Sequence, residues 1–456
     1  MRGMCLLFAS MLAMSSIAQA ATTPIKFGLF GNVHTIVPTK PFTHAVVLVS
    51  DKNGWDARAE SLAVAVGDSG VMVLGIDLPY YLAQMESIND KCSFPAGHFE
   101  EMIHWIQRDQ KVQTYIYPIL VGDGQGAALA YAVDAQAPLG TYTGLITLGW
   151  DSSLRFPKPI CSADAGAMTA PDNANPGQFR IIPVKKLPNP WIPKPFAPES
   201  RTAGLIGRVG RWAHLDSHST RTAAQSIVAA LAKITKPAES AATLPQDVAD
   251  LPLVEVAAQG TFANRVAIVL TGDGGWAGLD IAIADQLSKR GIEVVGLNTL
   301  KFFWQTRKPE EAADAVTRII GHYGAEHPQA DFVVLGYSFG AALSPVVINR
   351  LPSVAQARIA AQVLISPDPE AVFEIHVGDW FGSTHHEGAI PIAPEIDKTK
   401  VPVICVNGAD EGAEAFCPKI AGKPLVKLLT LPGAHHYNGD YDKLGASIVA
   451  SLPAKK

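Results

Sequence analysis

Short apolar runs alternate with stretches of helical periodicity in both halves of the chain. In each half, a run rich in β-branched residues is followed by a Gly-rich turn, a helical stretch and a second apolar run, and a further helix leads to a third. Apolar runs that alternate with helices predict the buried strands of a parallel sheet, because the crossover helices cover its faces. The expected strands are 46–49, 71–76 and 115–121 in the first half, and 266–270, 293–297 and 332–335 in the second.

The two halves form a repeat with a long period. Trp276 follows Trp55 by 221 residues (276 − 55), and Gly296 follows Gly75 by the same 221 (296 − 75). A constant offset at distant points indicates the duplication of a whole domain and not a solenoid of short units. We therefore predict two tandem domains of one α/β fold.

Composition sets the boundaries of these domains. Residues 1–20 combine a positive start, a short apolar run and a small-x-small site, which is typical of a cleaved signal peptide. The Ala-, Pro- and acid-rich stretch 241–262 is typical of a linker. We expect the domains to span 21–240 and 263–456, and the mature protein to be periplasmic.

Charge and cysteine content narrow the classes of function. Of the 456 residues, 48% are hydrophobic, which suffices for packed cores, and the net charge of −5 without a basic cluster weighs against nucleic-acid binding. Without the signal peptide, four cysteines remain in an oxidising compartment. We expect disulfides Cys405–Cys417 and Cys92–Cys161, with buried free thiols as the alternative. No Cys spacing suits zinc, so we expect no metal and no other cofactor.

The stretch 331–343 (DFVVLGYSFGAAL) carries the most specific motif. An apolar strand runs into G-x-S-x-G, and small residues then open a helix. This is the pattern of a nucleophile elbow, in which Gly336 and Gly340 leave room for a tight turn that presents Ser338. The amide of Phe339 would be one donor to the oxyanion. An ordinary Gly-rich turn is the alternative.

A serine nucleophile needs a histidine and an orienting acid, which follow it in the order acid, then histidine. The acid is expected after the apolar run 401–406, where Asp410 and Glu411 are both candidates. The histidine is expected after the last strand, where His435 and His436 are adjacent. His214 of the first half aligns with His435 (435 − 214 = 221), so we assign His435 as the base and His436 to the wall of the site.

The Gly-rich loop after the first strand of the second half (TGDGGW) is the expected source of the second oxyanion donor. We assign Gly274, Gly275 and Trp276 to oxyanion and substrate binding, with the Gly274 amide as donor. Asp273 stands where it would meet a cationic group of a substrate. A plain turn is the alternative.

The first half has the same turn without the chemistry. Its sequence there is Gly122-Asp-Gly124-Gln-Gly126, so Gly124 stands in place of Ser338. We therefore expect the first domain to be a degenerate α/β-hydrolase-like copy that has lost the nucleophile.

Several motifs of the second half together resemble the VirJ/AcvB family of bacterial virulence proteins. They are GDGGW, GLNTLKFFW, GYSFGA, VFEIHVGDWFG (372–382) and PGAHHYNGDY. The two-copy arrangement resembles the longer, AcvB-type members. The resemblance implies a periplasmic α/β-hydrolase that releases lysine from the aminoacylated phospholipid lysyl-phosphatidylglycerol. It also implies an association with type IV secretion components.

Two other functions stay open at this stage. One is a generic periplasmic esterase or lipase that acts on another ester. The other is a non-catalytic interaction protein of an envelope secretion system. The complete set of Ser338, an acid and His435 favours an enzyme, whereas the missing serine of the first half favours a second role for that domain.

Overall fold

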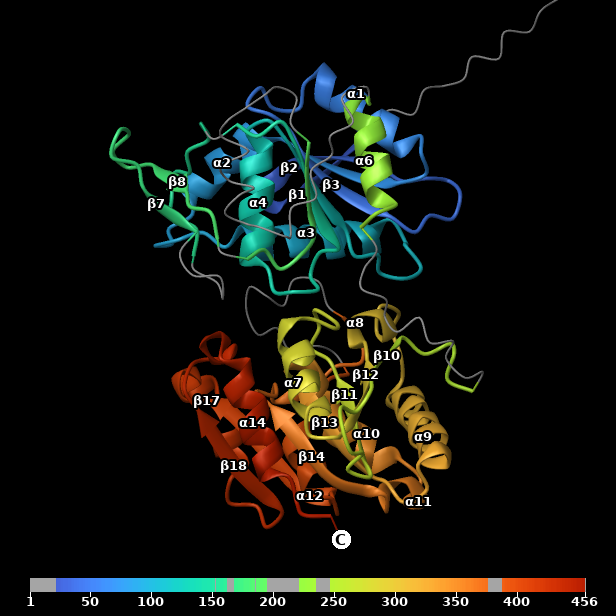
Figure 1. The fold of residues 1–456 in the computed structure, drawn as a ribbon. Coiled ribbons are helices and arrows are strands. Elements are labelled where there is room, and N and C mark those ends of the chain that lie inside the picture. The colour runs from blue at the N-terminus through green and yellow to red at the C-terminus, as the bar shows by residue number, and fades with distance from the viewer. Residues whose placement is uncertain are drawn as a thin grey trace, which may run out of the picture.

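The computed structural model describes residues 22–151, 153–161, 168–184, 186–194, 221–234, 247–375 and 388–455. These residues form two domains, stacked along the long axis of the molecule (Figure 1). Each domain is built around its own seven-stranded sheet. The expected signal peptide, His214 and residues 376–382 of the motif 372–382 lie outside the described residues.

The first sheet has the order β1-β2-β4-β3-β5-β6-β9, antiparallel at its β1–β2 edge and parallel from β4 onward. Its strands are β1 (Thr23–Phe27), β2 (Gly31–Ile36), β3 (Ala45–Val49), β4 (Met72–Ile76), β5 (Ile119–Asp123), β6 (Gly144–Leu148) and β9 (Trp191–Lys194). The other elements are helices α1 (Ala57–Gly67), α2 (Leu78–Ser87), α3 (Pro95–Asp109), α4 (Gly126–Gln136) and α6 (Ala223–Leu231), and the hairpin of β7 (Thr169–Pro171) and β8 (Phe179–Ile181).

The second sheet has the order β10-β12-β11-β13-β14-β17-β18, with only β10 antiparallel to its neighbour. Its strands are β10 (Leu253–Val256), β11 (Arg265–Leu270), β12 (Glu293–Leu297), β13 (Asp331–Tyr337), β14 (Ile359–Ile365), β17 (Val403–Gly408) and β18 (Val426–Leu431). Strands β15 (Glu370–Ala371) and β16 (Ile390–Pro391) form a separate antiparallel pair. The helices are α7 (Gly278–Ser288), α8 (Thr299–Phe302), α9 (Pro309–Glu326), α10 (Phe339–Arg350), α11 (Ser353–Gln356), α12 (Ile392–Lys398), α13 (Cys417–Ile420) and α14 (Tyr441–Ser451).

Both domains are α/β-hydrolase-like, and the duplication is visible in the strand order, since β2-β4-β3-β5-β6 corresponds to β10-β12-β11-β13-β14. The repeated Gly and Trp have a packing role. A Cβ on Gly75 would collide with the ring of Trp55, and a Cβ on Gly296 would collide with the ring of Trp276. In each domain, therefore, the glycine of the second parallel strand leaves the space that the tryptophan ring fills.

Two expectations about secondary structure differ from the observed elements. Residues 253–256 of the expected linker form β10 and pair with β12, because apolar Leu253 and Val254 are buried at the sheet edge. The expected strand 115–121 begins only at Ile119. The apolar residues before it, Tyr115 and Tyr117, are buried against the second domain instead.

Both expected disulfides, Cys92–Cys161 and Cys405–Cys417, are present. No helix in the described part of the chain is long and apolar enough to cross a membrane.

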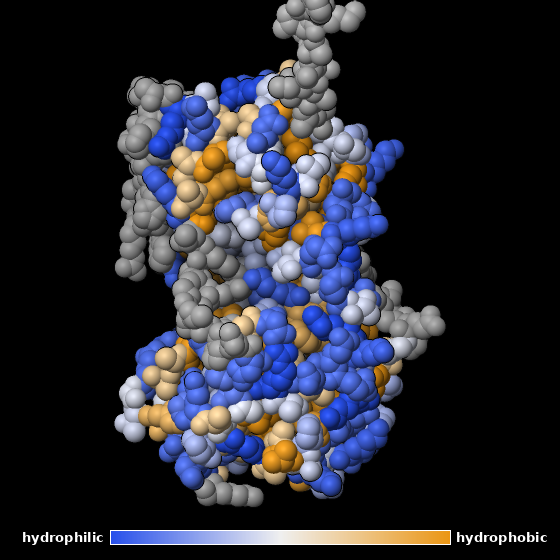
Figure 2. All heavy atoms as spheres, turned by 90° about the vertical axis from the view of Figure 1, so that its right-hand side faces the viewer, coloured by the Kyte–Doolittle hydropathy of each residue, from blue (hydrophilic) through white to orange (hydrophobic). Residues whose placement is uncertain are grey.

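The two domains meet through α3 and residues 112–117 of the first and residues 298–304 of the second. The Trp304 indole nitrogen donates to the Val112 carbonyl (2.8 Å), and the Arg108 guanidinium donates to the Trp304 carbonyl (2.8 Å). The Asn298 amide donates to the Tyr117 hydroxyl (3.1 Å). Figure 2 shows mostly hydrophilic residues on this side of the molecule at the level where the domains meet.

Candidate active site

Ser338 lies in a strained turn between β13 and α10. Its φ of 49° is in the left-handed region, which costs free energy for a residue with a side chain. The flanking glycines make the turn possible, because a Cβ on Gly336 would lie 2.5 Å from the Ala341 amide nitrogen. A Cβ on Gly340 would collide with the Leu270 carbonyl. The turn leaves Ser338 partly exposed at the N-terminus of α10.

His435 faces this serine from the loop after β18. Its Nε2 lies 3.0 Å from the Ser338 hydroxyl oxygen, which is hydrogen-bond distance. The ring of Tyr337 packs against the imidazole, with ring centroids 5.3 Å apart. Burial lowers the pKa of His435, and the neighbouring His436 lowers it further, while Glu411 opposes both. The imidazole is therefore neutral at neutral pH, as a general base must be.

His436 lies beside the base, as the sequence predicts for the wall of the site. Its side chain is exposed, and its Nδ1 lies 3.2 Å from the Tyr337 hydroxyl. The same hydroxyl donates to the His435 carbonyl (3.4 Å). Tyr337, one residue before the nucleophile, thus contacts both histidines and fixes the position of their loop.

The structure distinguishes the two candidate acids. Asp410 is exposed, and among the described residues its backbone amide donates a hydrogen bond to the Gly433 carbonyl (2.9 Å), whereas its carboxylate accepts none. The Glu411 carboxylate is partly buried and raises the pKa of His435 by its charge. These surroundings favour Glu411 as the residue that orients the base.

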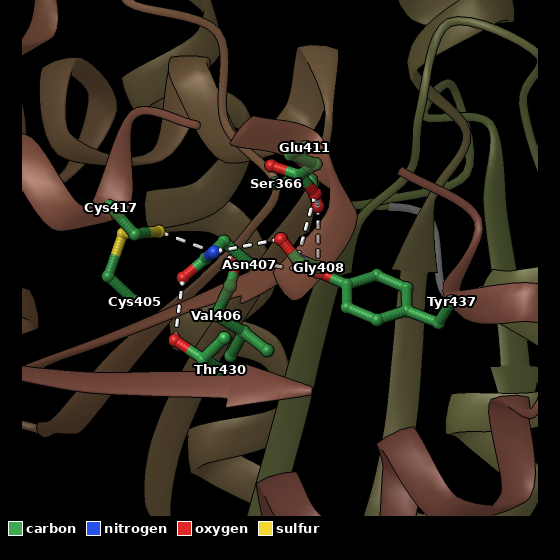
Figure 3. The surroundings of a disulfide bond; sticks show 9 residues. All are labelled: Ser366, Cys405, Val406, Asn407, Gly408, Glu411, Cys417, Thr430 and Tyr437. Atoms are coloured by element: carbon green, nitrogen blue, oxygen red, sulfur yellow. Dashed lines mark hydrogen bonds between the residues drawn. A yellow bond between two sulfur atoms is a disulfide. The ribbon is translucent and has the colours of Figure 1, made fainter. Parts of the chain in front are cut away.

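Glu411 is itself held by a network around the end of β17. Its carboxylate accepts hydrogen bonds from the Gly408 amide (2.9 Å) and the Ser366 hydroxyl (2.5 Å), and Ser366 in turn meets the Tyr437 hydroxyl (2.7 Å). Figure 3 shows these groups converging beside the Cys405–Cys417 disulfide, which spans the acid loop. Sequence analysis did not find Ser366. The only signal for it is its position directly after strand β14.

The groups expected to bind the oxyanion have different roles in the structure. Phe339 is the first residue of α10, so its amide has no partner within the helix and is available to an oxyanion. The amide of Gly275, which sequence analysis assigned to oxyanion or substrate binding, donates instead to the Gly272 carbonyl within the turn (3.0 Å). Gly272 lies against the elbow, since a Cβ on it would lie 3.1 Å from the Tyr337 ring.

The other loop residues divide into packing and site residues. Trp276 is only 8% exposed, and its ring packs against Gly296. It therefore supports the loop, whereas the sequence analysis had assigned it to substrate binding. Gly274 and Asp273 are partly exposed. Burial raises the pKa of Tyr337, Asp280 and Glu100, and the negative charge of Asp273 adds to each shift, so Asp273 lies near these groups.

The nucleophile, acid and histidine thus follow β13, β17 and β18, at the same edge of one parallel sheet. Residues 264–456 match the model of the family described as bacterial virulence protein (VirJ). The C-terminal domain is a VirJ domain. The family resemblance that its motifs carry is confirmed for this part of the chain.

The chain is also similar in fold to solved structures, at low identity. An alpha-beta serine hydrolase homologue from Coxiella burnetii is 14% identical, with 44% of this chain and 91% of that chain covered and a TM-score of 0.32. MenH from S. aureus is 14% identical, with 43% and 96% covered and a TM-score of 0.34. Proline iminopeptidase from Mycobacterium smegmatis is 13% identical, with 43% and 92% covered and a TM-score of 0.35. A search of curated proteins finds no similar sequence.

The VirJ domain combines the topology of an α/β-hydrolase with the serine–histidine pair of a serine hydrolase. Within the described part of the chain, no cluster of side chains suits a metal ion. The arrangement provides a nucleophile, a base and an orienting carboxylate for acyl transfer.

Proposed function

We propose that the protein is a periplasmic serine hydrolase that cleaves the aminoacyl ester of lysyl-phosphatidylglycerol into lysine and phosphatidylglycerol. The main support for a hydrolase is the 3.0 Å distance between the Ser338 hydroxyl oxygen and His435 Nε2, in an elbow of α/β-hydrolase geometry. The VirJ match supports the lipid substrate through the family resemblance. The two disulfides support an oxidising compartment.

The geometry supports a two-step reaction. Ser338 attacks the lysyl carbonyl carbon while His435 takes its proton, and the Phe339 amide stabilises the oxyanion together with the loop after β11. The intermediate then collapses, and His435 gives the proton to the departing glycerol oxygen of phosphatidylglycerol. Water, activated by His435, attacks the lysyl-serine ester, releases lysine and restores Ser338.

The deciding experiment compares lipid extracts of cells that carry the wild-type protein or Ser338→Ala. We expect lysyl-phosphatidylglycerol to accumulate in the variant, and the purified wild-type protein to release lysine from this lipid in mixed micelles. Equal lipid levels in both strains and no lysine release would contradict the substrate.

Labelling with a fluorophosphonate probe separates the remaining possibilities. Labelling of wild-type protein at Ser338, without action on lysyl-phosphatidylglycerol, would leave an esterase or lipase of another ester. No labelling at all would favour a non-catalytic partner of a secretion system.

A further inference from the structure

The first domain reaches the loop that follows β11 in the second domain. A Cβ on Gly274 would lie 3.6 Å from a carboxylate oxygen of Glu100, which belongs to α3 of the first domain. A Cβ on Gly275 would collide with the hydroxyl of Tyr117, also from the first domain. The covered loop adjoins the nucleophile, because the last residue of β11, Leu270, pairs with Gly336.

Glu100 is a buried carboxyl group with no hydrogen-bond partner in the described part of the chain. It is 8% exposed. Burial and the negative charge of Asp273 raise its pKa to about 8. A buried carboxylate normally has a cationic or hydrogen-bonding partner, because its desolvation is otherwise uncompensated. The charge that acts on Glu100 is instead that of a second carboxylate, Asp273.

Asp280, in the first turn of α7, adds an independent observation. It is 3% exposed, and its Oδ1 has no hydrogen-bond partner among the residues described. Burial raises its pKa, and the charge of Asp273 adds to the shift. Three acidic groups from two domains thus act on one another near one loop, and in the described ranges neither Glu100 nor the Asp280 Oδ1 accepts a hydrogen bond. A bound cation would favour the ionised form of these carboxyl groups, whose pKa values are raised in its absence.

We infer that Glu100 of the first domain and Asp273 of the second form a subsite for a primary ammonium group on the acyl part of the substrate. The degenerate domain therefore completes the active site of the catalytic one. This inference rests on the proposed hydrolase function. An ammonium group suits the subsite because it supplies three hydrogen-bond donors and one positive charge.

The direct test uses pairs of 4-methylumbelliferyl esters that differ in one group. The glycyl and propionyl esters differ by an ammonium or a methyl group beside the carbonyl, and the 6-aminohexanoyl and heptanoyl esters differ in the same way at the far end. We expect the full-length wild-type protein to prefer the ammonium ester in at least one pair, through a lower KM. Equal kcat/KM values within both pairs would overturn the inference.

The variants Glu100→Gln and Asp273→Asn locate the subsite. Each should reduce the ratio of kcat/KM for the ammonium ester to that for the neutral ester by about 10- to 100-fold, the usual effect of a lost charge-assisted hydrogen bond. A general loss of structure would lower both esters alike and leave the ratio unchanged. The matched control is Glu86→Gln, which removes an exposed charge of α2 in the same domain and should leave the ratio at the wild-type value.

The outcomes separate this inference from the proposed function. If Ser338→Ala hydrolyses every ester as fast as wild type, the proposed serine hydrolase function is wrong. If Ser338→Ala is inactive but Glu100→Gln keeps the wild-type ratio, only the role of the first domain is wrong. Should Glu100→Gln not fold, propylammonium must still inhibit the wild-type protein competitively where propanol does not, and equal inhibition by both would overturn the inference.

Discussion

The elbows of the two domains have the same backbone conformation, but only the second carries a nucleophile. Gly124 has a φ of 55° and Ser338 a φ of 49°, so the two turns match closely. The approach of the following helix also matches, because a Cβ on Gly122 would lie 2.5 Å from the Ala127 amide nitrogen, as on Gly336 it would from that of Ala341. The first domain therefore keeps the backbone of the elbow although it has no nucleophile there.

The site of the first domain is closed to catalysis by a second difference. The Asp51 carboxylate accepts a hydrogen bond from the backbone amide of Gln125 (2.8 Å). Gln125 corresponds to Phe339, whose backbone amide is the oxyanion donor of the second domain. A Cβ on Gly124 would collide with the same carboxylate. In the second domain, the position of Asp51 is taken by Gly272 (272 − 51 = 221). One acidic side chain thus fills both the space of a nucleophile and the oxyanion site.

The comparison teaches that a degenerate domain can lose its chemistry and still shape a site. The former site keeps a cavity of about 320 Å³, but the groups that would act there bond to each other, as Arg58 and Asp123 do (2.9 Å). The contribution of the first domain lies instead on another surface, where α3 meets the second domain.

The largest expected effect separates the two elbows directly. Ser338→Ala should lower kcat/KM for ester hydrolysis by roughly 10⁴-fold or more, because the covalent intermediate can no longer form. Asp51→Ala, in the first domain, should change it by less than about twofold. The measurement is steady-state hydrolysis of a neutral ester. A comparable loss in Asp51→Ala would show that the first elbow still takes part in the reaction.

The next effect separates the two acids of the catalytic domain. Glu411→Gln should reduce kcat by roughly 10⁴-fold, since the base then loses the carboxylate that orients it and stabilises its imidazolium. Asp410→Asn should stay within about twofold of wild type, because that side chain is exposed. If the two effects were reversed in the same kinetic assay, Asp410 would be the acid.

Short sequence motifs predicted those features of the fold and site that depend on contacts within one strand, turn or helix. The Gly and Trp repeat predicted the duplication because a ring fills the space above a glycine in each sheet, and G-x-S-x-G predicted the turn because its glycines meet a helix backbone. The choice between Asp410 and Glu411 depends on the turn that follows β17, which adjacent acids in a sequence do not define. The approach of Glu100 depends on contacts between domains, for which the sequence has no periodic signal.

A smaller effect tests whether both elbows are equally tight. Gly122→Ala and Gly336→Ala should each destabilise their own domain by about 1–3 kcal/mol, because the added methyl group meets the backbone of the following helix. Denaturant unfolding measures both losses. Only Gly336→Ala should also slow ester hydrolysis, since it displaces Ser338. An unfolding midpoint unchanged by either substitution would contradict the close approach at that turn.

The smallest expected effect is on the pH dependence of the catalytic domain. Its kcat/KM should fall at acid pH with a midpoint below 6.5, because burial and His436 lower the pKa of His435 and the reaction needs the neutral imidazole. His436→Gln removes a positive neighbour that disfavours the imidazolium, so the midpoint should move to higher pH. Glu411→Gln removes a negative neighbour that favours it, so the residual activity should persist to lower pH. Shifts in the same direction for both variants would mean that His435 is not the titrating base.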